Sequence, residues 1–171
     1  LRLAIKERGY KLLGDSAMSS LIQRAKSQEN ASVDIKRSGT LEQPGFRIFD
    51  AWRHQLEAWN FAKDLDAVML NMDMGTGKTK VVIDSVQNSG DKIVVVLCPA
   101  SVVGVWQREI VKHGSKDLVW DVPVLKGSVK KRAEQVAKAL ASPSSDFTVL
   151  VLNYEAAWRE PMAKLLKESR V

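Results

Sequence analysis

The sequence predicts an α/β fold in which a mostly parallel sheet lies between two layers of helices. Short runs of β-branched and other apolar residues occur at residues 67–72 (AVMLNM), 93–98 (IVVVLC) and 147–152 (FTVLVL). Stretches of ten or more residues with the apolar spacing of helices separate these runs. Strands that are apolar on both faces and alternate with helices indicate a parallel sheet that is covered on both sides.

Composition places the chain among soluble globular proteins. It has 171 residues, the length of one ordinary domain, with 45% apolar and 27% charged residues. No apolar run approaches the roughly 20 residues needed to cross a bilayer, and no secretory signal opens the chain. A single cysteine, Cys98, cannot form an internal disulfide. We therefore expect an intracellular protein, cytoplasmic or nucleoid-associated or nuclear. A start at Leu1 rather than at methionine indicates a fragment or a processed product.

Residues 1–45 form an N-terminal extension with no assigned role. Apolar residues at Met18, Leu21, Ile22 and Ala25 predict one amphipathic helix, with Asp15 or Ser16 as its cap. Residues 27–45 are polar and rich in turn formers, which predicts a loop or linker.

Residues 46–66 predict a short extended piece at 46–49 and then a helix. Asp50 is the expected cap. The apolar stripe of this helix consists of Trp52, Leu56, Trp59 and Ala62.

After residue 66, strands and helices alternate. The three apolar runs and residues 122–125 are the predicted strands. The predicted helices cover residues 78–88, 102–113, 129–140 and 155–169. Gly90 and Gly114 end the first two, and Pro161 breaks the last.

Residues 74–79 (MGTGKT) lie between a predicted strand and a predicted helix, which is the setting of a phosphate-binding loop. Glycines at 75 and 77 allow the backbone to approach an anion closely, and the new helix turns its positive end toward it. Lys78 supplies a charge for the β and γ phosphates, and the Thr79 hydroxyl suits Mg²⁺. Such a pattern arises by chance in on the order of one chain in a hundred of this length. The loop therefore predicts a site for a nucleoside triphosphate.

The loop resembles that of the Swi/Snf family of DNA translocases in helicase superfamily two, which usually has Asp-Glu-Met-Gly-Leu-Gly-Lys-Thr. The chain has the same Met before the first glycine, in residues 72–79 (MDMGTGKT). The full Walker pattern would place glycine at position 72, where this chain has Met72; helicase-type loops relax that position.

Gln55, in residues 53–59 (RHQLEAW), resembles the family's Pro-Tyr-Gln motif, whose glutamine reads the edge of adenine. A carboxamide offers a donor and an acceptor together, which suits that role. The Pro and Tyr are missing here. The alternative is a surface glutamine on an amphipathic helix.

Residues 98–109 (CPASVVGVWQRE) closely resemble the family's motif Ia, in which a strand end leads into a helix bearing Trp and Glu. The resemblance implies that Pro99, Ala100 and Ser101 meet a DNA phosphate, with Ser101 as a helix cap. For Trp106 we favour a core position.

Two weaker resemblances follow in the family's order. Gly127, ahead of the basic residues 130–132, is similar to a strand–glycine–basic-helix segment; the alternative is a solvated basic face. Asn153 and Tyr154 are similar to motif Ib, in which Thr precedes Tyr-Glu. Asn, like Thr, can hydrogen-bond to a phosphate oxygen. A net charge of +6 also favours a polyanion, although only mildly.

The resemblance covers residues 46–171 and implies the first RecA-like ATP-binding lobe of a double-stranded DNA translocase, with ATP and Mg²⁺ as cofactors and a second RecA-like lobe as partner. The acidic motif and the arginine fingers would lie beyond Val171, so the lobe is incomplete and we expect these residues alone to bind nucleotide weakly without hydrolysing it. An exposed apolar sheet edge or a partner segment is then expected. The implied nucleotide-site residues are Gln55, Met74, Gly75, Thr76, Gly77, Lys78, Thr79 and Lys80, with Lys78 and Thr79 catalytic and Thr79 on the metal.

Two other functions remain open. Another P-loop phosphotransferase would account for the loop but not for residues 99–109 or 153–155. The second is a non-catalytic nucleic-acid-binding or assembly module with a vestigial loop, which would differ by not binding ATP.

Overall fold

The computed structural model describes residues 41–65, 67–142 and 146–169, together with Ser20, Gln23, Ala25, Lys26 and Asn30. The chain divides into two compact units, Leu1–Thr40 and Leu41–Val171. The five described residues of the first unit are helical, and Asn30 is one of them although we predicted a loop there. The rest of the predicted N-terminal helix and linker, up to residue 40, lies outside the described residues.

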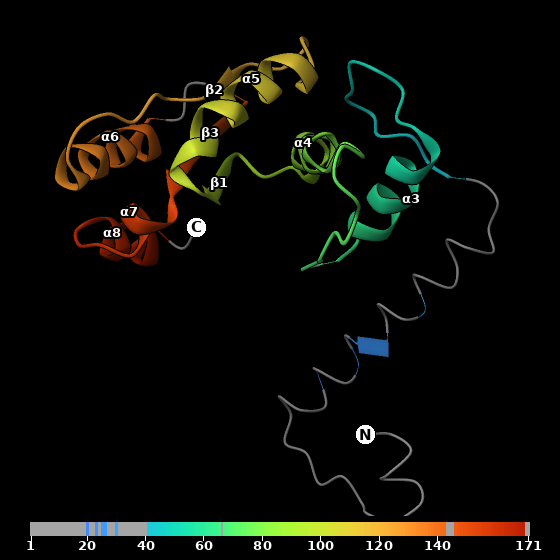
Figure 1. Ribbon diagram of the computed structural model, residues 1–171, viewed down its shortest axis with the longest axis horizontal. Helices are drawn as coiled ribbons and strands as arrows, with labels where there is room; N and C mark the ends of the chain where they lie inside the picture. Colours follow the sequence, from blue (N-terminus) through green and yellow to red (C-terminus); the bar gives the residue numbers. More distant parts are fainter. Residues whose placement is uncertain are drawn as a thin grey trace, which may run out of the picture. The chain divides into compact units, whose positions relative to one another are not determined.

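The second unit is built on a parallel sheet of three strands (Figure 1). The strands are β1 (Ile93–Cys98), β2 (Trp120–Asp121) and β3 (Phe147–Asn153), and their order is β1-β3-β2. Ile93 pairs with Thr148 at one end of β1, and Cys98 pairs with Asn153 at the other. The carboxyl ends of β1 and β3 therefore meet at one edge of the sheet.

One face of the sheet packs against α4 (Lys78–Ser89) and α5 (Val103–His113). Val149 and Val151 of β3 form a buried cluster there with Ile83 of α4 and Ile110 of α5. Trp106 packs against the same cluster, which confirms the predicted core position.

The opposite face packs against α6 (Val129–Ala141) and α8 (Met162–Glu168). Leu150 and Leu152 of β3 contribute to a second buried cluster with Val136 and Met162. Successive β3 residues thus point alternately into two helix layers, as strand geometry requires. The predicted α/β fold with a parallel sheet covered on both sides is confirmed.

Most predicted helices are present with bounds close to those expected. Helix α4 ends before Gly90, whose φ of 82° is the left-handed conformation that glycine adopts readily at a helix end. Helix α3 (Arg53–Ala62) begins later than expected, because Trp52 rather than Asp50 is its N-cap. Asp50 instead pairs with Arg47, 3.0 Å away. The predicted final helix is split into α7 (Tyr154–Ala157) and α8, on either side of Pro161.

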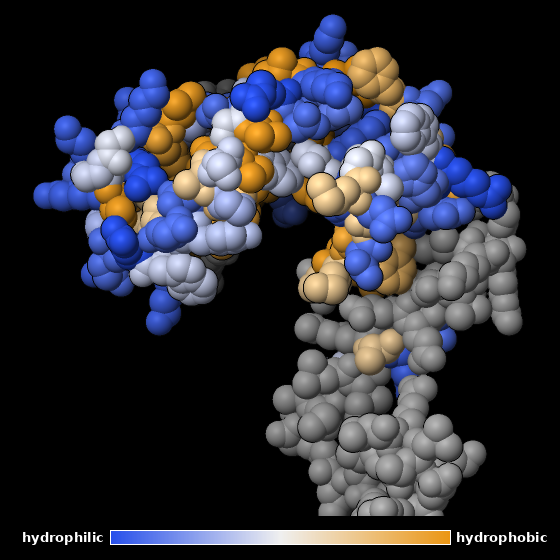
Figure 2. All heavy atoms as spheres, in the orientation of Figure 1, coloured by the Kyte–Doolittle hydropathy of each residue, from blue (hydrophilic) through white to orange (hydrophobic). Residues whose placement is uncertain are grey.

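The predicted strand at residues 67–72 is not formed. A strand needs a hydrogen-bonded neighbour. Within the described sheet β1 is an edge strand that pairs only with β3, so residues 67–72 do not pair with it. Met69 is 89% exposed, and Met74 is 96% exposed. Figure 2 shows hydrophobic side chains at the surface beside α3 as well as over α5. The loop is therefore preceded by an irregular, largely exposed apolar segment and not by a strand.

The predicted strand at residues 122–125 was also wrong, because β2 lies just before it. The Trp120 ring stacks on Phe147 with 5.0 Å between ring centroids, and the two residues pair in the sheet. Pro123 has no N–H to donate, so the ladder cannot continue through it. Register and proline together place the strand at Trp120–Asp121.

None of the helices in the described ranges is long and apolar enough to span a membrane.

Candidate nucleotide-binding site

The glycine loop adopts a conformation that only glycine accepts easily. Gly75 has a φ of 78° and Gly77 a φ of 83°, both in the left-handed region. The Thr76 hydroxyl donates to the carbonyl of Asp73 at 2.7 Å and holds the turn closed. Gly77 is the N-cap of α4, so the free N–H groups of the first helical turn open directly from the loop. This is the arrangement that attracts an anion.

The Lys78 ammonium is held over the start of the loop. Its Nζ donates to the carbonyl oxygens of Met72 and Asp73, both at 2.7 Å. An ammonium has three N–H donors, and no other described residue accepts from the third. Lys78 therefore combines a fixed position with one donor left for a ligand.

The next two residues of α4 differ in what they offer. The Thr79 hydroxyl makes no hydrogen bond to any described residue, and Thr79 lines a cleft beside the loop. Lys80 is only 6% exposed, and its ammonium forms an ion pair with Asp84 one turn further along. The Lys80 charge is thus directed at a carboxylate within the protein.

Gln55 supports the loop from α3. Its Oε1 accepts from the N–H of Trp52, and its Nε2 donates to the carbonyl of Thr76, both at 3.0 Å. His54 Nε2 also lies 3.0 Å from that carbonyl, which requires the tautomer with hydrogen on Nε2. A Cβ on Gly77 would be 2.4 Å from Gln55 Nε2. Because Gln55 is 6% exposed and bonded at both ends, its amide is used to position the loop.

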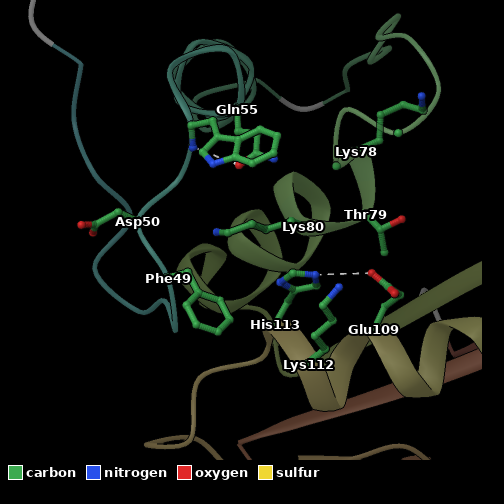
Figure 3. A pocket seen from close by; sticks show the side chains of 12 residues that line it. Phe49, Asp50, Gln55, Lys78, Thr79, Lys80, Glu109, Lys112 and His113 are labelled. Carbon is green, nitrogen blue, oxygen red and sulfur yellow. Dashed lines mark hydrogen bonds and ion pairs between the residues drawn. The ribbon is translucent and has the colours of Figure 1, made fainter.

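A cleft of about 570 Å³ runs from the loop along α4 (Figure 3). This volume lies within the range of small-molecule sites, roughly 300–1,000 Å³. Its walls come from the start of α3 and the segment before it, from the loop and the start of α4, and from the last turns of α5. The lining residues are Phe49, Asp50, Trp52, Gln55, Gly75, Gly77, Lys78, Thr79, Lys80, Glu109, Lys112 and His113.

The α5 wall was missed by sequence reasoning. Glu109 and His113 are one helical turn apart, with Glu109 Oε2 3.5 Å from His113 Nε2. The four-residue spacing of Glu109 and His113 is visible in the sequence, but no local sequence pattern indicates that this turn of α5 faces the glycine loop. Its proximity depends on how α4 and α5 pack on the sheet.

His113 has a pKa below its ordinary value of 6.5, because burial disfavours the imidazolium more strongly than the nearby Glu109 carboxylate stabilises it. Its Nδ1 is buried without a hydrogen-bond partner among the described residues. The cleft wall thus holds a neutral imidazole at neutral pH.

Asp84 has a raised pKa, because burial outweighs the effect of the Lys80 ammonium beside it.

We expect this histidine to make stability depend on pH. The unfolded chain binds a proton at His113 more readily than the folded one, so the free energy of unfolding should decrease as pH falls through about 6.5. Chemical denaturation between about pH 7.5 and about pH 5.5 should give a flatter profile for His113→Gln than for the parent protein. The matched control is His54→Gln, since the chain has two histidines. Equal slopes for His113→Gln and the parent would contradict the expectation.

The residues proposed for nucleic acid lie at the carboxyl edge of the sheet. Pro99, Ala100 and Ser101 follow β1 and are exposed, while Asn153 forms the last pair of the β1–β3 register and Tyr154 follows it. The structure thus brings these two segments together.

Ser101 does not cap α5, contrary to prediction. It lies within the 3-10 turn Ala100–Val102, and Val102 is the N-cap, with no side-chain hydrogen bond. The turn intervenes because the carbonyl of Pro99 accepts from the N–H of Val102 at 2.9 Å.

Gly127 has a φ of 94° and precedes Ser128, whose hydroxyl accepts from the N–H of Lys131 and caps α6. Arg132, in the same helix, donates to Asn153 Oδ1 at 2.8 Å. One guanidinium therefore links the basic helix to the end of β3. The Asn153 amide is also bonded to Glu155, at 2.6 Å.

No protein-family model and no curated protein sequence matches this chain. Among the described residues, no group of three or more His, Cys, Asp or Glu side chains could hold a metal ion. A Mg²⁺ at this site would therefore need phosphate oxygens and water in addition to Thr79, which is the usual manner of nucleotide-bound Mg²⁺.

Proposed function

We propose that residues 46–171 are the ATP-binding lobe, RecA-like in fold, of an ATP-dependent motor that moves along double-stranded DNA, as the resemblance to the Swi/Snf family implies. The observation that carries the proposal is the Lys78 ammonium, fixed by the carbonyls of Met72 and Asp73 at the mouth of a glycine loop that opens a helix. This arrangement fits a triphosphate tail, because free backbone N–H groups and one cation belong to the same loop.

The nucleotide would extend from the loop into the cleft, with Thr79 as the protein ligand of its Mg²⁺. The metal would draw charge from the terminal phosphates, while Lys78 and the amides of the loop hold the tail in place. We expect the 171 residues alone to bind ATP without turning it over.

Duplex DNA is the proposed partner at the carboxyl edge of the sheet. Exposed Pro99, Ala100 and Ser101 lie there beside Asn153 and Tyr154, and Arg132 brings a positive charge to the same place. Contacts of this kind hold the phosphate backbone and carry little sequence information. A motor that moves along DNA of any sequence requires such contacts.

Titration with ATP and Mg²⁺ tests the loop. Lys78→Ala should weaken ATP binding by about tenfold to a hundredfold, because a hydrogen bond to a charged phosphate is worth about 1.5–3 kcal/mol. The matched control is Lys138→Ala, at an exposed position of α6. Unchanged ATP affinity in Lys78→Ala would show that the loop is not the phosphate site.

The same titration in the presence of duplex DNA tests the motor. We expect the protein to bind duplexes of unrelated sequence with similar affinity, and more weakly as salt is raised. Lys78→Ala should leave this DNA affinity intact. ATP binding without any DNA binding would favour another P-loop phosphotransferase, and DNA binding without ATP binding would favour a nucleic-acid-binding module.

A further inference from the structure

The end of the cleft away from the loop has its own chemistry. Figure 3 shows Phe49 across the cleft from Lys78 and Thr79, whereas His113 and Glu109 project from the α5 wall, with Glu109 drawn on the side of Thr79. The loop end offers cationic and N–H groups. The rest of the cleft offers the Phe49 ring, the uncharged imidazole of His113, the Glu109 carboxylate and the Lys112 ammonium. A ligand that fills the whole cleft would therefore need an anionic tail and a planar, hydrogen-bonding head.

Phe49 is suited to stack against such a head. Its side chain is 56% exposed although it lines the cleft, and no aromatic ring of the described residues packs against it. Trp52, the other aromatic residue of the lining, already meets His54 edge-on at 5.7 Å between ring centroids. Stacking of a base on an exposed ring is one of the strongest contacts that such a wall can offer.

Glu109 is suited to the sugar. A carboxylate accepts hydrogen bonds and donates none, so a pair of vicinal hydroxyl groups is a good partner, whereas a phosphate is repelled. Acidic side chains accept from ribose hydroxyls in other nucleotide sites. Glu109 Oε2 lies 3.5 Å from His113 Nε2, so the carboxylate and the imidazole share one wall of the cleft. In Figure 3 Glu109 lies between Thr79 and the side of the cleft that holds Phe49, which is where a sugar would lie between the phosphates and a base.

We propose that this end of the cleft is the base-and-sugar subsite of a ribonucleotide, in which Phe49 stacks on the base and Glu109 accepts a hydrogen bond from a ribose hydroxyl. The inference rests on the proposed function, because it takes the loop as the phosphate end. It adds a preference for ribose that the loop alone cannot provide. It also assigns to α5 a part in nucleotide selection, while Gln55 keeps the loop in position.

Three probes separate the parts of the site: ATP, its 2′,3′-dideoxy analogue, and inorganic tripolyphosphate. Calorimetric titration of the 171-residue chain should give about tenfold tighter binding of ATP than of the dideoxy analogue, the value of one hydrogen bond to a charged group. In Glu109→Ala this ratio should fall to about one. Tripolyphosphate affinity should stay equal or increase, because a negative charge leaves the cleft. Glu134→Ala, at an exposed position of α6, is the matched control and should keep the tenfold ratio.

Phe49→Ala should weaken ATP by about tenfold and leave tripolyphosphate unchanged, since a stacked base is worth about 1–3 kcal/mol. Phe46→Ala is the control, because Phe46 is similarly exposed but does not line the cleft. An unchanged ATP-to-dideoxy ratio in Glu109→Ala, or equal binding of ATP and tripolyphosphate by the parent chain, would overturn the subsite while the loop still binds phosphate. If none of the three probes bound, or if Lys78→Ala left tripolyphosphate binding unchanged, the proposed function would fail as well.

Discussion

Replacing Asp84 with alanine should lower the free energy of unfolding by about 3–5 kcal/mol, the cost of leaving a buried charge without its partner. Asp84 is 1% exposed and Lys80 is 6% exposed, so neither charge has adequate access to water. Asp84 also accepts from Gln87 Nε2 at 3.0 Å. Gln87 Oε1 in turn accepts from the N–H of Ser115, which follows α5, at 2.9 Å. Chemical denaturation followed by circular dichroism measures the loss.

Two variants control this experiment. Lys164 and Glu168 have the same four-residue spacing on α8 but are well exposed, so Glu168→Ala should change stability by less than about 0.5 kcal/mol. The double variant Lys80→Met, Asp84→Leu removes both charges and should recover most of the loss. A small effect of Asp84→Ala, similar to that of Glu168→Ala, would mean that the pair is not buried in solution.

Gly77→Ala should both destabilise the protein and abolish ATP binding. A φ of 83° costs a residue with a side chain about 1–2 kcal/mol. The added Cβ would also lie 2.4 Å from Gln55 Nε2, which forces Gln55 away from the carbonyl of Thr76. Losing the hydrogen bonds of Gln55 raises the total to about 2–4 kcal/mol. Stability and ATP affinity are measured on the same sample.

Gly75→Ala separates the two causes, because Gly75 has a similar φ of 78° but nothing within 4 Å of an added Cβ. It should show the backbone cost alone, about 1–2 kcal/mol. Adding Gln55→Ala to Gly77→Ala should relieve the clash but not the strain. If Gly75→Ala and Gly77→Ala were equally destabilising, the contact with Gln55 would be unimportant.

The parts of the fold that local pattern determines could be predicted from the sequence. The run at Ile93–Cys98 became β1 with the expected bounds, since it is apolar on both faces and too short for a helix. The run at residues 67–72 is equally apolar but is not a strand. Apolar pattern reports a tendency toward burial, whereas a strand also needs a neighbour, and the neighbour is set by the topology. The shift of β2 to Trp120–Asp121 has the same origin, because the register with Phe147 decides where pairing begins.

The candidate site likewise has a part that the local sequence predicts and a part that depends on tertiary packing. The loop is a local motif, and its glycines have the positive φ values that we expected of them. Phe49 precedes α3, whereas Glu109 and His113 lie on α5, and only the packing of α3 and α5 beside α4 brings these distant segments to one cleft. Gln55 was found by its motif, but its bonds to Trp52 and Thr76 depend on where α3 lies.

The carbonyl of Thr76 accepts from both Gln55 and His54, and this fixes more than the carbonyl itself. In a trans peptide the C=O of one residue and the N–H of the next point in opposite directions. With the Thr76 oxygen held toward α3, the Gly77 amide hydrogen is kept pointing away from that helix. Turning this peptide unit over would break both bonds at once, so the amide is preorganised before any ligand arrives.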